Sequence, residues 1–175
     1  MALFVLTAFT LLAVALASGQ RTTTYRAPLE ADLIALEYVA SGGLGTDSTI
    51  FRLFGDGRLT KQSGSDGALL AEKILSAEQS DFFITTINAG RLMHWDPERL
   101  GTELRAQLGY NPVMVDAGRV TLRLKLEDQN GVLEERELTH SYAPWQIKKL
   151  YPALSIPEIE ALAEIEKQLD DLTQT

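Results

Sequence analysis

The sequence predicts an α+β domain in which an antiparallel sheet of hairpins packs against two or three helices, behind an N-terminal apolar export helix. Short segments of alternating apolar and polar side chains are separated by glycine-containing turns, which is typical of hairpins. Other segments begin at helix caps and repeat apolar side chains every three or four residues, which is typical of amphipathic helices. Hydrophobic residues make up 45% and charged residues 23% of the 175-residue chain, so one core can form.

The first residues predict export from the cytoplasm. The segment Ala2–Ala17 is apolar and uncharged, and it is shorter than the roughly 20 residues of a membrane-spanning helix. Ala15 and Ala17 supply the small side chains of a signal-peptide cleavage site. We therefore expect residues 1–17 to be a signal peptide and the protein to be extracytoplasmic, either periplasmic or secreted. The alternative is an uncleaved membrane anchor in residues 1–20, which would be the protein's only contact with a membrane.

A short linker is expected between the export segment and the folded domain. Residues 18–28 are polar, rich in threonine and without periodicity, as linkers often are. Residues 29–175 contain no internal repeat and no second boundary in composition, which predicts a single α+β domain.

Four short strands are expected in the first half of this domain. Ile34–Val39 predicts a strand with Ile34, Leu36 and Tyr38 on one face. Thr49–Phe54 and Arg58–Gln62 flank Gly55–Gly57, and two strands around an Asp-Gly turn predict a hairpin. Leu69–Ile74 would be a further strand.

A capped helix follows these strands. Ser76 and Gln79 have the spacing of a capping box, and the helix would run from Ala77 to about Asn88. Ala89-Gly90 would then form its C-terminal cap. The side chains expected to face the core are Phe83, Ile84 and Ile87.

Two more helices are expected further along the chain. Asp96-Pro97 has the pattern of a helix start, and Gly109 would end that helix. Pro144–Tyr151 predicts a short helical turn, and Ser155 with Glu158 predicts a second capping box before the last helix. The apolar positions of the two helices are Leu100, Leu104 and Leu108 in the first, and Ile159, Leu162, Ile165, Leu169 and Leu172 in the last.

A second hairpin is expected between these helices. Arg119–Glu127 has strictly alternating apolar and polar side chains, which predicts a half-buried strand. Asn130-Gly131 favours a type I′ turn, and Val132–Ser141 would return as the partner strand. Opposite charges are expected to face each other across the hairpin, Glu135 and Glu137 on one strand and Arg123 and Lys125 on the other.

Charge and composition exclude several classes of function. The net charge is −8, and no stripe of lysine or arginine is present, so we expect no nucleic acid partner. The chain has no cysteine, which excludes disulfides, thiolate catalysis and cysteine-based metal centres.

No catalytic residue, metal site or cofactor is predicted. His94 and His140 are the two histidines, and neither lies within a nucleophile or metal-binding motif, so structural or exposed roles are expected. Asp56 and Asp128 have only part of the oxygen pattern of a calcium loop, and both sequences predict turns.

Four aromatic residues are the candidates for a binding surface. Exposed aromatic side chains often mark recognition surfaces, although aromatic residues also build cores. The candidates are Trp95, Tyr142, Trp145 and Tyr151.

The order of the expected elements resembles a family of exported bacterial domains of unknown function. The matching segments are Ile50–Leu59, Leu75–Phe83 and Val120–Leu169. That family has a Cys-Phe-Gly-x-Cys-Pro segment before its hairpin, whereas Gly42–Ser48 has no cysteine. The resemblance implies export and carries no assigned activity.

Three hypotheses for the function follow from these features. The first is a non-catalytic exported module that binds a protein partner or the cell envelope. The second is a hydrolase whose serine, histidine and acidic residues are scattered in the sequence. The third is a structural domain tethered to the membrane by its N-terminal segment.

Overall fold

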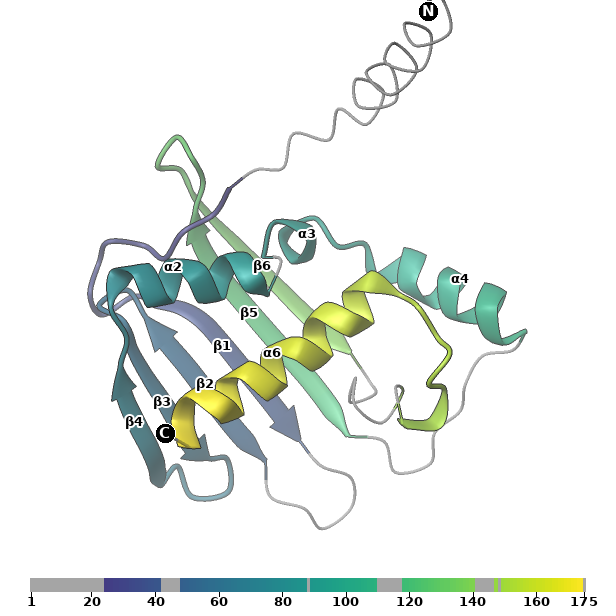
Figure 1. Ribbon diagram of the computed structural model, residues 1–175, viewed down its shortest axis with the longest axis horizontal. Coiled ribbons are helices and arrows are strands. Elements are labelled where there is room, and N and C mark those ends of the chain that lie inside the picture. Colours follow the sequence, from purple (N-terminus) through teal and green to yellow (C-terminus); the bar gives the residue numbers. More distant parts are fainter. Residues whose placement is uncertain are drawn as a thin grey trace, which may run out of the picture.

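The computed structural model describes residues 24–41, 48–87, 89–109, 118–140, 147 and 149–174. In this part of the chain, six strands form one antiparallel sheet, and four helices accompany it (Figure 1). The predicted α+β class is thus confirmed. The apolar N-terminal segment lies outside the described residues.

The sheet has the strand order β4-β3-β2-β1-β5-β6, and every neighbouring pair is antiparallel. Its second half joins at β1, because β5 pairs with β1 after the chain has passed through helices α2, α3 and α4. The first strands and the late hairpin predicted from the sequence are all present. The bounds are β1 Ile34–Ser41, β2 Thr49–Phe54, β3 Arg58–Ser63, β4 Leu69–Ile74, β5 Arg119–Glu127 and β6 Leu133–His140.

The turn between β2 and β3 shows why its sequence requires glycine. The carboxylate of Asp56 accepts a hydrogen bond from the backbone N–H of Arg58 at 2.9 Å. Gly57 follows in the left-handed region with φ of +84°, and a Cβ atom there would lie 2.3 Å from the carbonyl oxygen of Leu75. Only glycine tolerates both conditions, so the predicted hairpin is confirmed with its turn.

The turn between β5 and β6 differs from the predicted type I′ geometry. The backbone N–H of Gly131 donates to the carbonyl of Asp128, which places Gln129 and Asn130 at the centre of the turn. Gly131 has φ of +74°, and the N–H of Asp128 closes the loop on Val132. This is the arrangement of a type I turn followed by a left-handed glycine. The Asp128 carboxylate accepts hydrogen bonds from two backbone N–H groups of the loop, which favours this turn.

The first helix, α2 (Ala77–Thr86), has the predicted capping box at Ser76 and Gln79. It ends earlier than expected, because Ile87 is its C-terminal cap and Ala89 already begins the next helix, α3 (Ala89–Met93). Ile87 and Leu92 are both buried. Five residues of continuous helix would turn them to well-separated faces, so the chain changes direction between them. The predicted Ala89-Gly90 cap is therefore wrong.

The remaining helices are α4 (Pro97–Leu108) and α6 (Pro157–Gln174). Asp96 caps α4, and Gly109 ends it in the left-handed region with φ of +76°, both as predicted. The capping box predicted before α6 does not form. The N–H of Ser155 donates to the side chain of Gln107, and its hydroxyl donates to Glu160 at 3.4 Å. Gln107 of α4 and Glu160 of α6 thus bind the two polar groups of Ser155 that the box would have used.

The core lies between one face of the sheet and the helices α2 and α6, which cross that face in Figure 1. Phe83, Ile84 and Ile87 are buried, as predicted for the first helix. Alternate residues of β5 supply the sheet side, namely Val120, Leu122, Leu124 and Leu126. The buried stripe of α6 consists of Ile159, Leu162, Ile165 and Leu169, with Leu172 partly buried at its end.

The start of the described chain is bonded to the sheet. Tyr25 is buried, and Arg26 forms a β-bridge and an ion pair with Glu127 at 2.8 Å. The last residues of the predicted 18–28 linker thus lie against β5. Among the helices that the structure describes, none combines the length and the hydropathy needed to cross a membrane.

Candidate functional site

The four aromatic candidates fall in different surroundings. Tyr142 and Trp145 lie outside the described residues. Trp95 is only 5% exposed, and its backbone carbonyl accepts a hydrogen bond from Arg136 of β6. Tyr151 is partly buried against the core before α6. Trp95 and Tyr151 thus belong to the core or its margin, and a binding role for the set stays a prediction.

His94 belongs to a small polar cluster at the N-terminal end of the described chain. Its Nε2 atom lies 3.5 Å from the hydroxyl of Tyr25, and that hydroxyl donates a hydrogen bond to Glu134 at 2.8 Å. Burial and the bond to Glu134 raise the pKa of Tyr25 to about 12. A phenol that holds its proton so firmly is a poor nucleophile near neutral pH. The side chain of His140 lies outside the described residues.

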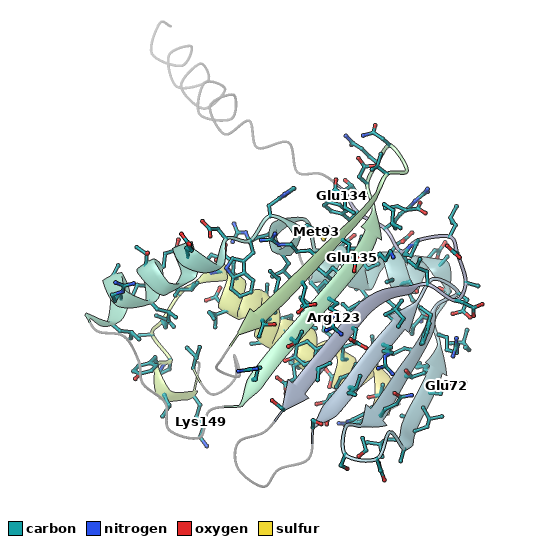
Figure 2. The ribbon with its side chains drawn as sticks, turned by 180° about the vertical axis from the view of Figure 1, so that it is seen from behind. Glu72, Met93, Arg123, Glu134, Glu135 and Lys149 are labelled. Atoms are coloured by element: carbon teal, nitrogen blue, oxygen red, sulfur yellow. The ribbon has the colours of Figure 1, made fainter. Side chains whose placement is uncertain are left out.

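No described helix covers the face of the sheet opposite α2 and α6, and this uncovered face carries a ladder of charges (Figure 2). At its centre is Glu37, only 7% exposed. Arg52 of β2 and Arg123 of β5 donate to its two carboxylate oxygens at 2.7 and 2.6 Å. Arg52 also bonds Gln62 of β3, and Arg123 bonds Glu137 of β6. Side chains from five neighbouring strands are thus linked across the sheet.

The electrostatics of this ladder follow from the two guanidinium groups. Burial alone would raise the pKa of Glu37, but the hydrogen bonds from Arg52 and Arg123 outweigh burial and hold the pKa below its usual value. The predicted pairs across the late hairpin are confirmed beside it, Arg123 with Glu137 at 2.9 Å and Lys125 with Glu135 at 3.7 Å.

A hollow of about 400 Å³ lies next to the ladder on the same face. Residues before and within β1 form one side of it, and residues of the late hairpin form the other. Four of its five charged side chains are already paired, because Glu37 binds Arg123 and Lys125 faces Glu135, whereas Asp32 has no ion-pair partner within the described residues. A ligand there would have to replace existing ion pairs. The lining residues are Asp32, Leu33, Ile34, Glu37, Arg123, Leu124, Lys125 and Glu135.

A second hollow, the α2/α6 groove, lies between the first half of α2 and the end of α6. Its volume is about 550 Å³, within the range of roughly 300–1,000 Å³ found for ligand sites. Apolar atoms form most of its surface, and Phe82 at its side is 72% exposed. The lining residues are Glu78, Gln79, Phe82, Phe83, Gln168, Asp171 and Leu172.

The neighbouring elements position these groove residues. The capping box at Ser76 fixes the start of α2, and Phe83 anchors that helix by entering the core. Consecutive helical residues differ by about 100° in direction, so the buried stripe of Phe83, Ile84 and Ile87 directs Phe82 to the surface. At the other side, Leu169 is buried, and Leu172 lies one turn further toward solvent.

The sequence pattern of α2 indicates that Phe82 faces outward. Phe83, Ile84 and Ile87 form the predicted core stripe, and at about 100° per residue Phe82 points away from the centre of that stripe. Leu172 was expected to belong to the core stripe, and it does pack partly against the core. Its second role, as a wall of the groove, depends on two helices that are far apart in sequence.

Neither metal ligands within the described residues nor known relatives point to a function for this site. Within the described ranges, no three histidine or acidic residues gather in a way that could hold a metal ion. Comparisons of the chain with models of known families and with curated proteins return no match. The resemblance to exported bacterial domains therefore rests only on the order of the elements.

Proposed function

We propose that this protein is an exported, non-catalytic module that binds a protein partner in the cell envelope through the α2/α6 groove. The single observation that carries the proposal is the exposure of Phe82 beside an apolar groove large enough for several side chains. A large exposed apolar side chain next to a hollow is the usual feature of a protein contact.

The surroundings of the groove support the same proposal. Strand β4 continues into α2, and its side chains Leu69, Leu70 and Ile74 are also exposed. Strand β4 is an edge of the sheet, with β3 as its one neighbour. Exposed apolar side chains on an edge strand are unfavourable unless a partner covers them.

The other hypotheses have weaker support in the described residues. A hydrolase would need a histidine that contacts both a serine and a carboxylate, whereas His94 faces the hydroxyl of Tyr25. A tethered structural domain depends on residues 1–20, which lie outside the described chain. Periplasmic, secreted and membrane-anchored locations all remain compatible with a binding module, and export is part of the proposal.

The test is capture of partners from envelope extracts with three forms of the protein. These are the wild type, Phe82→Ser and the matched control Val132→Ser, which changes an exposed apolar side chain (55% exposed) in the late hairpin. We expect the same proteins to be captured by the wild type and the control, and to be lost with Phe82→Ser. Equal capture by all three forms would contradict the proposal. The intact mass and the cell fraction of the native protein test export directly.

A further inference from the structure

The charge of the helix layer indicates the chemistry of the partner. Helices α2 and α6 together contain eight acidic residues and a single basic residue, Lys167, while the whole chain has a net charge of −8. On the uncovered sheet face, by contrast, Glu37, Glu135 and Glu137 are paired with arginine or lysine. The acidic excess of the protein therefore lies mainly on the two helices that border the α2/α6 groove.

Two of these acids line the groove, one from each helix. Glu78 and Asp171 line it from the two helices, and Asp81 is exposed one turn after Glu78 on α2. Neither Glu78 nor Asp81 has an ion-pair partner within the described residues. Phe82 lies four residues after Glu78, on the same side of the helix. An apolar hollow is thus bordered by carboxylates.

We propose that the α2/α6 groove binds a basic amphipathic helix of the partner protein, with apolar side chains in the hollow and lysine or arginine beside the carboxylates. This inference rests on the proposed function and names the class of partner. The groove lies between two helices, and an amphipathic helix presents apolar anchors at three- and four-residue spacing that suit such a groove. The acidic border favours a cationic helix and disfavours an acidic one.

The inference is tested with two synthetic amphipathic peptides of equal length, one of leucine and lysine and one of leucine and glutamate. Binding to the protein in the form isolated from cells is measured by calorimetry at low and high salt. We expect the leucine–lysine peptide to bind and the leucine–glutamate peptide not to bind. Phe82→Ser should weaken the binding by roughly tenfold or more, as loss of a central anchor does, and Val132→Ser should not weaken it.

The electrostatic contribution has its own matched pair of variants. Glu78→Lys and Glu98→Lys make the same change of charge in the first turn of a helix, in α2 beside the groove and in α4 away from it. We expect Glu78→Lys to weaken the peptide by roughly three- to tenfold at low salt, with a smaller effect at high salt. Equal weakening by the two variants would indicate general attraction to an acidic protein, and it would overturn the inference.

Other occupants of the groove give distinct outcomes. A dimer that Phe82→Ser converts to a monomer would identify a second copy as the occupant. Peptide binding that occurs only after residues 1–17 are removed would identify the N-terminal segment as the occupant. Either result overturns the inference. An envelope partner that needs Phe82 but has no basic amphipathic segment would also overturn it, although the proposed function would stand. Peptide binding without any Phe82-dependent envelope partner would support the inference on the groove and contradict the proposed function.

Discussion

Replacement of Glu37 by glutamine tests whether the charge ladder stabilises the sheet. The Glu37 side chain lies on the uncovered face but is largely buried by its neighbours. Arg52 and Arg123 each donate to one of its carboxylate oxygens. Glutamine keeps the size of the side chain and one acceptor oxygen, but it removes the negative charge between two guanidinium groups. Both ion pairs are lost in one substitution.

The expected loss of unfolding free energy follows from the exposure of the two arginines. A hydrogen bond to a charged group contributes about 1.5–3 kcal/mol, whereas an exposed ion pair contributes about 0–1 kcal/mol. The side chain of Arg52 is mostly buried and that of Arg123 is half exposed, so the bond from Arg52 dominates. We expect Glu37→Gln to lower the free energy of unfolding by about 2 kcal/mol, or Tm by roughly 4–8 °C.

The assay is urea unfolding followed by circular dichroism, with Glu135→Gln as the control. Glu135 is 68% exposed and lies 3.7 Å from Lys125, so its substitution should cost less than about 0.5 kcal/mol. Glu37 has a lowered pKa, so its stabilisation is present above the ordinary glutamate pKa and is lost as the pH falls through its folded-state pKa. The difference between Glu37→Gln and the wild type should therefore shrink in acid. Equal effects of the two substitutions at neutral pH would refute the reasoning.

Three further predictions concern single side chains. Burial raises the pKa of Glu166, which accepts a hydrogen bond from Tyr38 at 2.9 Å. Stability of the wild type should therefore fall as the pH rises above the ordinary glutamate pKa toward the raised one. In thermal unfolding curves, Glu166→Gln should remove this fall. An unchanged dependence of Tm on pH in the variant would contradict the role of Glu166. Gly57→Ala should lower the free energy of unfolding by more than about 2 kcal/mol, because the added Cβ meets a carbonyl oxygen at 2.3 Å. Gly131→Ala has open space around the added Cβ and should lower it by about 1 kcal/mol. Similar losses for the two glycines would show that the close contact relaxes. Phe82→Ser should change the free energy of unfolding by less than about 0.5 kcal/mol, and a large loss in urea unfolding would mean that Phe82 acts in folding.

The elements of the fold were predictable where their signals are local. The alternation in Arg119–Glu127 and the cap at Ser76 each act within a few residues, and both elements formed as expected. The errors have a different origin. Ile87 ends α2 because the chain must turn to bury the next helix as well, and Ser155 is held by Gln107 from another helix. Contacts between residues distant in sequence thus decided both the end of α2 and the start of α6.

The candidate site depends even more on distant contacts. The pair of Arg123 with Glu137 was predictable, because the two residues face each other in one hairpin. Glu37 was not, since β1 meets β5 only after the chain has passed through three helices. The α2/α6 groove is similar, because Phe82 and Leu172 come from two helices and lie about 90 residues apart in the sequence. Sequence patterns show which face of each helix is apolar, but they do not show where two helices diverge.

The two surfaces of the protein differ in how their charges are used, and this difference bears on where a partner would bind. On the uncovered sheet face, Glu37 already has two arginine donors, and Arg123 also has Glu137. A ligand there must break bonds of about the strength that it can form, so its net gain is small. On the helix layer, Glu78 lines an apolar hollow and has no ion-pair partner within the described residues. A cationic amphipathic helix would there gain apolar burial and a new ion pair with Glu78. The helix layer is therefore the stronger candidate surface, although the sheet face has more charged groups in contact.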